Sequence, residues 1–245
     1  MDEALEQSAR GAAEKFTAEL AALWWAQIGP SIIGVYRIGS LAHGGFSRRY
    51  SDVDVAIISE MGLNDTELDQ ARQAALDLSA RWGAKLSIFW ADRAFSIGRF
   101  PPLDRVDYID HGVPLIERDR VRPDRPTLGE IRTYLRGQPL DSWRQQVIRF
   151  AAATSLAPAD HKPYLRTLLY PARFTYSWMT GSMASNDTAV AFLLKTAPEG
   201  IDIGVVARAL RFRQDASDVD RLLSDREKLP GLFAGCIRMV ETTTR

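Results

Sequence analysis

The stretches GVYRIGS at residues 34–40 and SDVDVAII at residues 51–58 decide the fold. The first is apolar and predicts a strand that ends in the pair Gly39-Ser40. The second predicts a strand that carries Asp52 and Asp54, two positions apart. Side chains at positions i and i+2 of a strand point to the same face. We therefore expect the two carboxylates to project together.

These paired carboxylates indicate a cation site. Two carboxylates aimed at one point repel each other unless a cation lies between them. Oxygen ligands of this kind, completed by phosphate oxygens, are those that Mg²⁺ prefers. Asp52 and Asp54 are thus candidate ligands of Mg²⁺ or Mn²⁺. The alternative is a solvent-facing strand that carries two aspartates for solubility.

The Gly-Ser pair has the features of a phosphate-binding turn. Gly39 lets a phosphate approach the backbone closely, and the Ser40 hydroxyl is a hydrogen-bond donor. Ser40 also suits the N-cap of a helix. Arg48 and Arg49 would offset the charge of a bound triphosphate, with a solvated loop pair as the alternative. These residues together predict a nucleoside-triphosphate site.

The order of strand, Gly-Ser pair and Asp-hydrophobic-Asp strand resembles the nucleotidyltransferase superfamily. Within it, GGF at residues 44–46 and the segments LLYPARFTY (168–176) and TGSMAS (180–185) look like aminoglycoside (streptomycin/spectinomycin) adenylyltransferases. The resemblance implies Mg²⁺-dependent transfer of AMP from ATP to a hydroxyl of a small acceptor, with release of pyrophosphate. It implies Asp52 and Asp54 as catalytic metal ligands. It also implies nucleotide contacts at Gly39, Ser40, Arg48, Arg49 and Asn186, the last standing where those enzymes carry a lysine.

The third strand leaves two alternatives to this function open. Relatives carry an acid there, and the alignment puts Leu86 at that position, with Ser87 one residue away. Neither side chain accepts a proton at neutral pH. The chain could therefore be a catalytically degenerate nucleotide-binding sensor or partner module. Transfer of AMP to a protein partner is the other alternative.

Periodicity predicts two domains, an α/β nucleotidyltransferase domain over residues 1–122 and an all-α helical bundle over residues 127–245. The first should hold a small mixed sheet with flanking helices. Its strands are expected at 32–38, 53–58, 85–90 and 114–116, and its helices at 3–27 and from Asn64 to Gly83. Helices of the second are expected at 128–135, 141–153, 164–179, 187–195, 203–212 and 231–242.

Composition excludes several classes of protein. The 245 residues have no net charge, but residues 1–126 carry 15 Lys and Arg against 19 Asp and Glu, and the rest carry 16 against 12. Neither half has the basic stripe that a nucleic-acid partner needs. A single cysteine, Cys236, excludes an internal disulfide. The acidic N-terminus and the interrupted apolar region before residue 36 predict neither a secretory signal nor a membrane span, so we expect a cytoplasmic protein.

Overall fold

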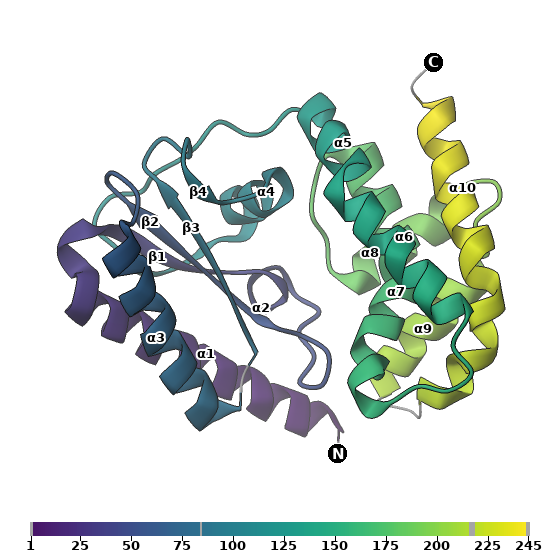
Figure 1. Ribbon diagram of the computed structural model, residues 1–245, viewed down its shortest axis with the longest axis horizontal. Coiled ribbons are helices and arrows are strands. Elements are labelled where there is room, and N and C mark those ends of the chain that lie inside the picture. The colour runs from purple at the N-terminus through teal and green to yellow at the C-terminus, as the bar shows by residue number, and fades with distance from the viewer. Residues whose placement is uncertain (1, 84, 216–218, 244–245) are drawn as a thin grey trace. The chain divides into compact units, whose positions relative to one another are not determined.

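A computed structural model describes residues 2–83, 85–215 and 219–243. The chain divides into two compact units, Met1–Pro126 and Thr127–Arg245. Figure 1 shows strands and helices in the first unit and helices in the second.

The first unit is built on a mixed sheet, as predicted, and the sheet has five strands where four were expected. Its strand order is β4-β3-β2-β1-β5. Strands β2 and β3 run parallel, whereas the other neighbouring pairs are antiparallel. The strands are β1 (Ile32–Ile38), β2 (Val53–Ser59), β3 (Leu86–Asp92), β4 (Gly98–Arg99) and β5 (Val113–Glu117).

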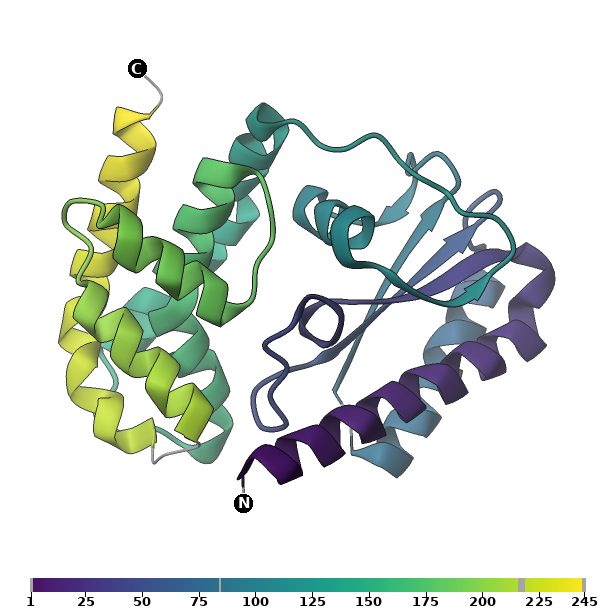
Figure 2. The same cartoon turned by 180° about the vertical axis from the view of Figure 1, so that it is seen from behind.

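Helices cover both faces of this sheet. Helices α1 and α3 lie on one face and α4 lies on the other, as Figures 1 and 2 show. The capping box between Asn64 and Glu67 starts α3, and Gly83 ends it in the left-handed conformation. The helices are α1 (Asp2–Ile28), the 3₁₀ turn η1 (Gly29–Ser31), α2 (Ser40–His43), α3 (Asp65–Trp82) and α4 (Pro102–His111).

The alternation of side chains along β2 assigns each residue to one of two cores. Val53, Val55 and Ile57 pack in the core beneath α1 and α3, which we call the α1/α3 core. Ala56 and Ile58 pack in the core beneath α4, which we call the α4 core. Because direction alternates along a strand, Asp54 belongs to the α4 side of the sheet.

The second unit is all helical, as predicted, and is organised around α7. Trp143 of α6 stacks on Tyr170 at 4.6 Å between ring centroids, and Tyr170 and Phe174 continue the stack to Trp178. The elements are α5 (Leu128–Arg136), α6 (Gln138–Ala151), η2 (Pro158–Asp160), α7 (His161–Thr180), α8 (Asn186–Thr196), α9 (Ile203–Asp215), η3 (Val219–Lys228) and α10 (Leu229–Thr242).

Two further features of the chain bear on its chemistry. Cys236 on α10 is fully buried, and burial raises the pKa of its thiol to about 12, so it is a packed, unreactive side chain. Across the described ranges, no helix combines the length and apolar character that crossing a membrane requires.

Candidate active site

Gly39 joins β1 to α2 in a conformation that suits only glycine. Its backbone angles are φ 71° and ψ −161°, which side-chain-bearing residues rarely adopt. Its carbonyl accepts hydrogen bonds from the amides of Ala42 and His43, each at 2.9 Å. Its own N–H donates to Asp107 Oδ2 at 2.6 Å. Hydrogen bonds to both the carbonyl and the N–H of Gly39 therefore hold the turn, and the Gly39 N–H is already bonded within the protein.

The carboxylate of Asp54 lies against this turn. A Cβ atom built on Gly39 would come within 2.1 Å of Asp54 Oδ2 and 2.8 Å of its Cβ. The pairing of Ile38 with Asp54 in the β1–β2 ladder brings the two together. Asp52 precedes β2, whose first residue is Val53, and both aspartates are half-buried. The structure thus unites the Gly-Ser turn with the aspartate strand.

Ser40 links the turn to the residue before the aspartates. It is the first residue of α2, and Gly39 is the N-cap, so the expectation of Ser40 as an N-cap is wrong. The Ser40 hydroxyl donates to Ser51 Oγ at 3.1 Å, and the same oxygen accepts the N–H of Ser47 at 3.0 Å. The hydroxyl therefore stands between the turn and the start of the Asp-x-Asp segment.

The remaining predicted nucleotide contacts lie on a loop and in the second unit. Arg48 and Arg49 are exposed, and the Arg48 N–H donates to Glu6 Oε2 at 2.9 Å, which ties the loop to α1. Asn186 is half-buried and begins α8 directly after the N-cap Ser185. Their roles remain predictions.

Asp107 is the site residue that sequence reasoning missed. It lies within α4, is 2% exposed, and accepts the Gly39 N–H. One turn further along α4, His111 meets His43 of α2, with ring centroids 5.8 Å apart. Helix α4 thus contacts the turn at two points. The available signal was an aspartate flanked directly by two apolar residues, Val106 and Tyr108.

The third strand corrects the position assigned to the missing acid. Leu86 pairs with Val53 and packs against the α1/α3 core, so it lies on the face opposite Asp54. Ser87 pairs with Asp54 and shares its face. An acid at position 86 would therefore not lie beside Asp54, whereas an acid at position 87 would. The residue beside Asp54 is a serine.

The acids at the other end of the strands serve the fold. Asp92 Oδ1 accepts the amides of Ser96 and Ile97, and its Oδ2 accepts the Ser96 hydroxyl. Burial alone would raise the pKa of Asp92, but these hydrogen bonds outweigh burial and lower it. Asp92 is five residues from Ser87, or about 17 Å along the strand.

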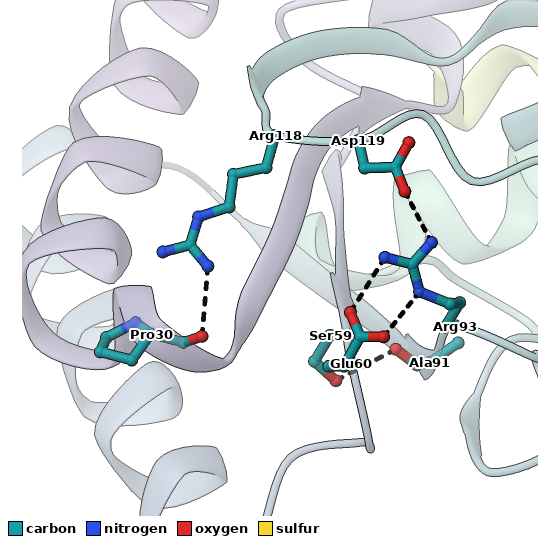
Figure 3. Close-up of polar contacts among 7 residues, drawn as sticks. All are labelled: Pro30, Ser59, Glu60, Ala91, Arg93, Arg118 and Asp119. Atoms are coloured by element: carbon teal, nitrogen blue, oxygen red, sulfur yellow. Dashed lines mark hydrogen bonds and ion pairs between the residues drawn. The ribbon is translucent and has the colours of Figure 1, made fainter.

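Figure 3 shows the ion-pair cluster at the same end of the sheet. The Arg93 guanidinium pairs with Glu60, after β2, and with Asp119, after β5. The Ser59 hydroxyl donates to the Ala91 carbonyl and bridges β2 to β3. Arg118 donates to the carbonyl of Pro30 at 3.3 Å. These contacts connect the C-terminal ends of β2, β3 and β5, whereas Asp54 lies at the start of β2.

The residues of the site fit a cation that arrives with a triphosphate. Across the described ranges, no group of three or more acidic, histidine or cysteine side chains is arranged to hold a metal ion. Asp52 and Asp54 would supply two carboxylates, and Mg²⁺ usually takes one or two carboxylates plus phosphate oxygens and water. The space over the Gly39 α-carbon, which any Cβ would fill, is occupied by the Asp54 carboxylate.

Comparison with known proteins shows the fold. The chain is similar to the solved structure of the spectinomycin adenyltransferase AAD(9) from Enterococcus faecialis with ATP and spectinomycin. The TM-score is 0.62 at 12% sequence identity, over 88% of this chain and 98% of that one. The predicted resemblance to aminoglycoside adenylyltransferases is therefore confirmed at the level of fold. No protein-family model and no curated protein sequence matches the chain.

Proposed function

We propose that this protein is a Mg²⁺-dependent nucleotidyltransferase that transfers AMP from ATP to a hydroxyl of a small acceptor. The observation that carries the proposal is the Asp54 carboxylate lying against Gly39 of the Gly-Ser turn. The fold neighbour supports it, because its structure contains ATP and the small molecule spectinomycin.

Each residue of the site has a defined task in this proposal. Asp52 and Asp54 would hold Mg²⁺, which would supply neutralisation of phosphate charge and a lower pKa of the attacking hydroxyl. Ser40 donates its hydroxyl to a phosphate oxygen in place of Ser51. Arg48 and Arg49 offset the remaining charge of the triphosphate. Asn186, in the second unit, stays a predicted nucleotide contact that carries a neutral amide at the position where the resemblance implies a lysine.

The reaction breaks one bond and forms one. The acceptor oxygen attacks the α-phosphorus of ATP, a new phosphorus–oxygen bond forms, and the bond to the bridging oxygen breaks to release pyrophosphate. The acceptor's proton passes to water, because Ser87 does not accept a proton at neutral pH. Loss of a general base costs about 10²–10⁴-fold in rate, so we expect slow turnover.

The proposal is tested by ATP binding and pyrophosphate release. Calorimetric titration of ATP with and without Mg²⁺ reports binding, and pyrophosphate release in the presence of a panel of hydroxyl compounds reports transfer. Mg²⁺-dependent ATP binding together with acceptor-dependent pyrophosphate release is the expected result. A protein that binds no ATP in the presence of Mg²⁺ contradicts the proposal.

A second candidate is a nucleotide-binding module without turnover. Ser87 beside Asp54 favours it, because the strand that carries an acid in relatives has none on this face. Mg²⁺-dependent ATP binding, without release of pyrophosphate from ATP in the presence of any acceptor, would select this candidate.

A further inference from the structure

Helix α4 supplies a buried carboxylate to the Gly-Ser turn from a part of the chain that carries no nucleotidyltransferase motif. Asp107 lies 68 positions after Gly39 and is 2% exposed. A carboxylate this buried is costly unless hydrogen bonds satisfy it. Its Oδ2 lies 2.6 Å from the Gly39 nitrogen, a short distance typical of a charge-assisted hydrogen bond.

This hydrogen bond acts on the most constrained residue of the site. A backbone conformation like that of Gly39 persists only where surrounding contacts hold it, and such residues gather at functional sites. The contacts of its carbonyl with Ala42 and His43 are local to the turn. The contact between the Gly39 amide and Asp107, by contrast, fixes the turn to a separate element, helix α4.

The orientation of Gly39 also determines where Asp54 can lie. The Asp54 carboxylate occupies the space that a side chain on Gly39 would need. Rotation of the Gly39 peptide would move the backbone surface against which Asp54 lies. It would also move the Ser40 hydroxyl, because Ser40 follows directly in the chain. We infer that Asp107 is a positioning residue that sets the shape of the Gly-Ser turn and, through it, the places of Asp54 and Ser40. Its role in catalysis rests on the proposed function.

The amide of Gly39 offers a readout that is independent of activity. In the full chain labelled with ¹⁵N-glycine, hydrogen exchange at Gly39 is followed in Asp107→Ala and Asp107→Asn. Asp110→Asn is the control, since it removes a carboxylate of the same helix that pairs with Arg125 and not with the turn. We expect Asp107→Ala to raise the Gly39 exchange rate about tenfold or more beyond any change in global stability, in line with loss of a charged hydrogen bond. Asp107→Asn keeps an acceptor oxygen, so its Gly39 exchange rate should lie between those of Asp107→Ala and the parent.

Ligand affinity then separates positioning from a merely structural role. Asp107→Ala should weaken Mg·ATP binding about tenfold and leave adenosine binding unchanged, with partial recovery in Asp107→Asn. An unchanged Gly39 exchange rate in Asp107→Ala overturns the inference. Faster exchange with unchanged Mg·ATP affinity overturns it as well. If Asp107→Ala does not fold, the Asn variant decides on the same two readouts. A parent that binds no Mg·ATP refutes the proposed function, and exchange at Gly39 still decides whether Asp107 holds the turn.

Discussion

Asp54 Oδ2 lies where a side chain on Gly39 would have to be, 2.1 Å from the ideal Cβ position. The contact joins the turn that follows β1 to Asp54 on β2. Two features therefore require glycine at position 39. The Asp54 carboxylate fills the space of a Cβ atom, and the backbone has positive φ. The Gly-Ser pair and the Asp-x-Asp pair are therefore one structural unit.

Gly39→Ala should consequently disrupt the site more than backbone strain alone would. Gly44→Ala is the matched control, because Gly44 also has positive φ but has open space around a built Cβ. We expect Gly44→Ala to cost about 1–3 kcal/mol of stability and to keep Mg·ATP affinity. Gly39→Ala should cost more and lose that affinity, as measured by denaturant unfolding and calorimetry. Equal effects of the two substitutions would contradict the Gly39–Asp54 contact.

The paired aspartates should make triphosphate binding depend on metal. Asp52→Asn combined with Asp54→Asn should abolish Mg²⁺-dependent ATP binding in calorimetric titrations. The thermal midpoint should stay equal or rise, because like charges no longer repel. Asp69→Asn with Asp77→Asn on the exposed side of α3 controls for charge loss. If the site variant binds Mg·ATP as tightly as the parent, the two-carboxylate site is wrong.

Local signals were sufficient to predict the elements around these residues. Strand 32–38 follows from an apolar run between Pro30 and Gly39, and α3 follows from the Asn64 cap and the Gly83 stop. The helices of the second unit follow from their apolar periodicity. In each case the signal lies within the element itself, so neighbouring strands need not be known.

Helix α4 and strand β4 could not be predicted in this way. The pattern of α4 is interrupted by Asp107, whose burial depends on a hydrogen bond to Gly39 far away in the chain. The run Asp110-His111-Gly112 at its end is typical of a turn, although Pro102 at the start and Gly112 after the last residue are helix signals. Strand β4 has two residues and exists through pairing with Trp90 and Ala91.

The Ser40 hydroxyl should contribute to triphosphate binding and not to recognition of the nucleoside. Ser40→Ala should weaken Mg·ATP binding by about 1–3 kcal/mol, the range for a hydrogen bond to a charged group. Adenosine should bind the variant and the parent alike in the same titration. Ser51→Ala removes the hydroxyl that accepts the Ser40 hydrogen bond, and it serves as a control for disturbance of the loop. Equal losses for ATP and adenosine in Ser40→Ala would indicate a local folding defect.

Asp92 should make the first unit sensitive to acid. Its folded pKa is lowered, so its contribution to stability is present above the unfolded pKa of about 3.9 and is lost as pH falls through the folded value. Asp92→Asn should lower the free energy of unfolding by about 1–3 kcal/mol at pH 7 and by less near pH 3. Urea unfolding at pH 7, 5 and 3 measures this. If the loss of unfolding free energy in Asp92→Asn grew as pH fell, the lowered pKa of Asp92 would be contradicted.

The register of β2 and β3 identifies the position at which a base can be restored. Ser87 shares the face of Asp54, so Ser87→Asp places a third carboxylate beside it. Like charges on neighbouring strands repel, so the thermal midpoint should fall without metal and recover with Mg·ATP. Pyrophosphate release should rise by as much as about 10²-fold if the new carboxylate acts as a general base.

Two further variants make this restoration test decisive. Ser87→Asn has a similar shape without a carboxylate and should leave the transfer rate at the parent level. Leu86→Glu should destabilise the protein by about 1–3 kcal/mol in denaturant unfolding, because it puts a charge against the α1/α3 core. A stable Leu86→Glu protein with raised turnover, together with an inactive Ser87→Asp, would show that the strand presents the opposite face to the site. A stable Ser87→Asp that binds Mg·ATP more tightly and still releases no pyrophosphate would favour the nucleotide-binding module over the enzyme.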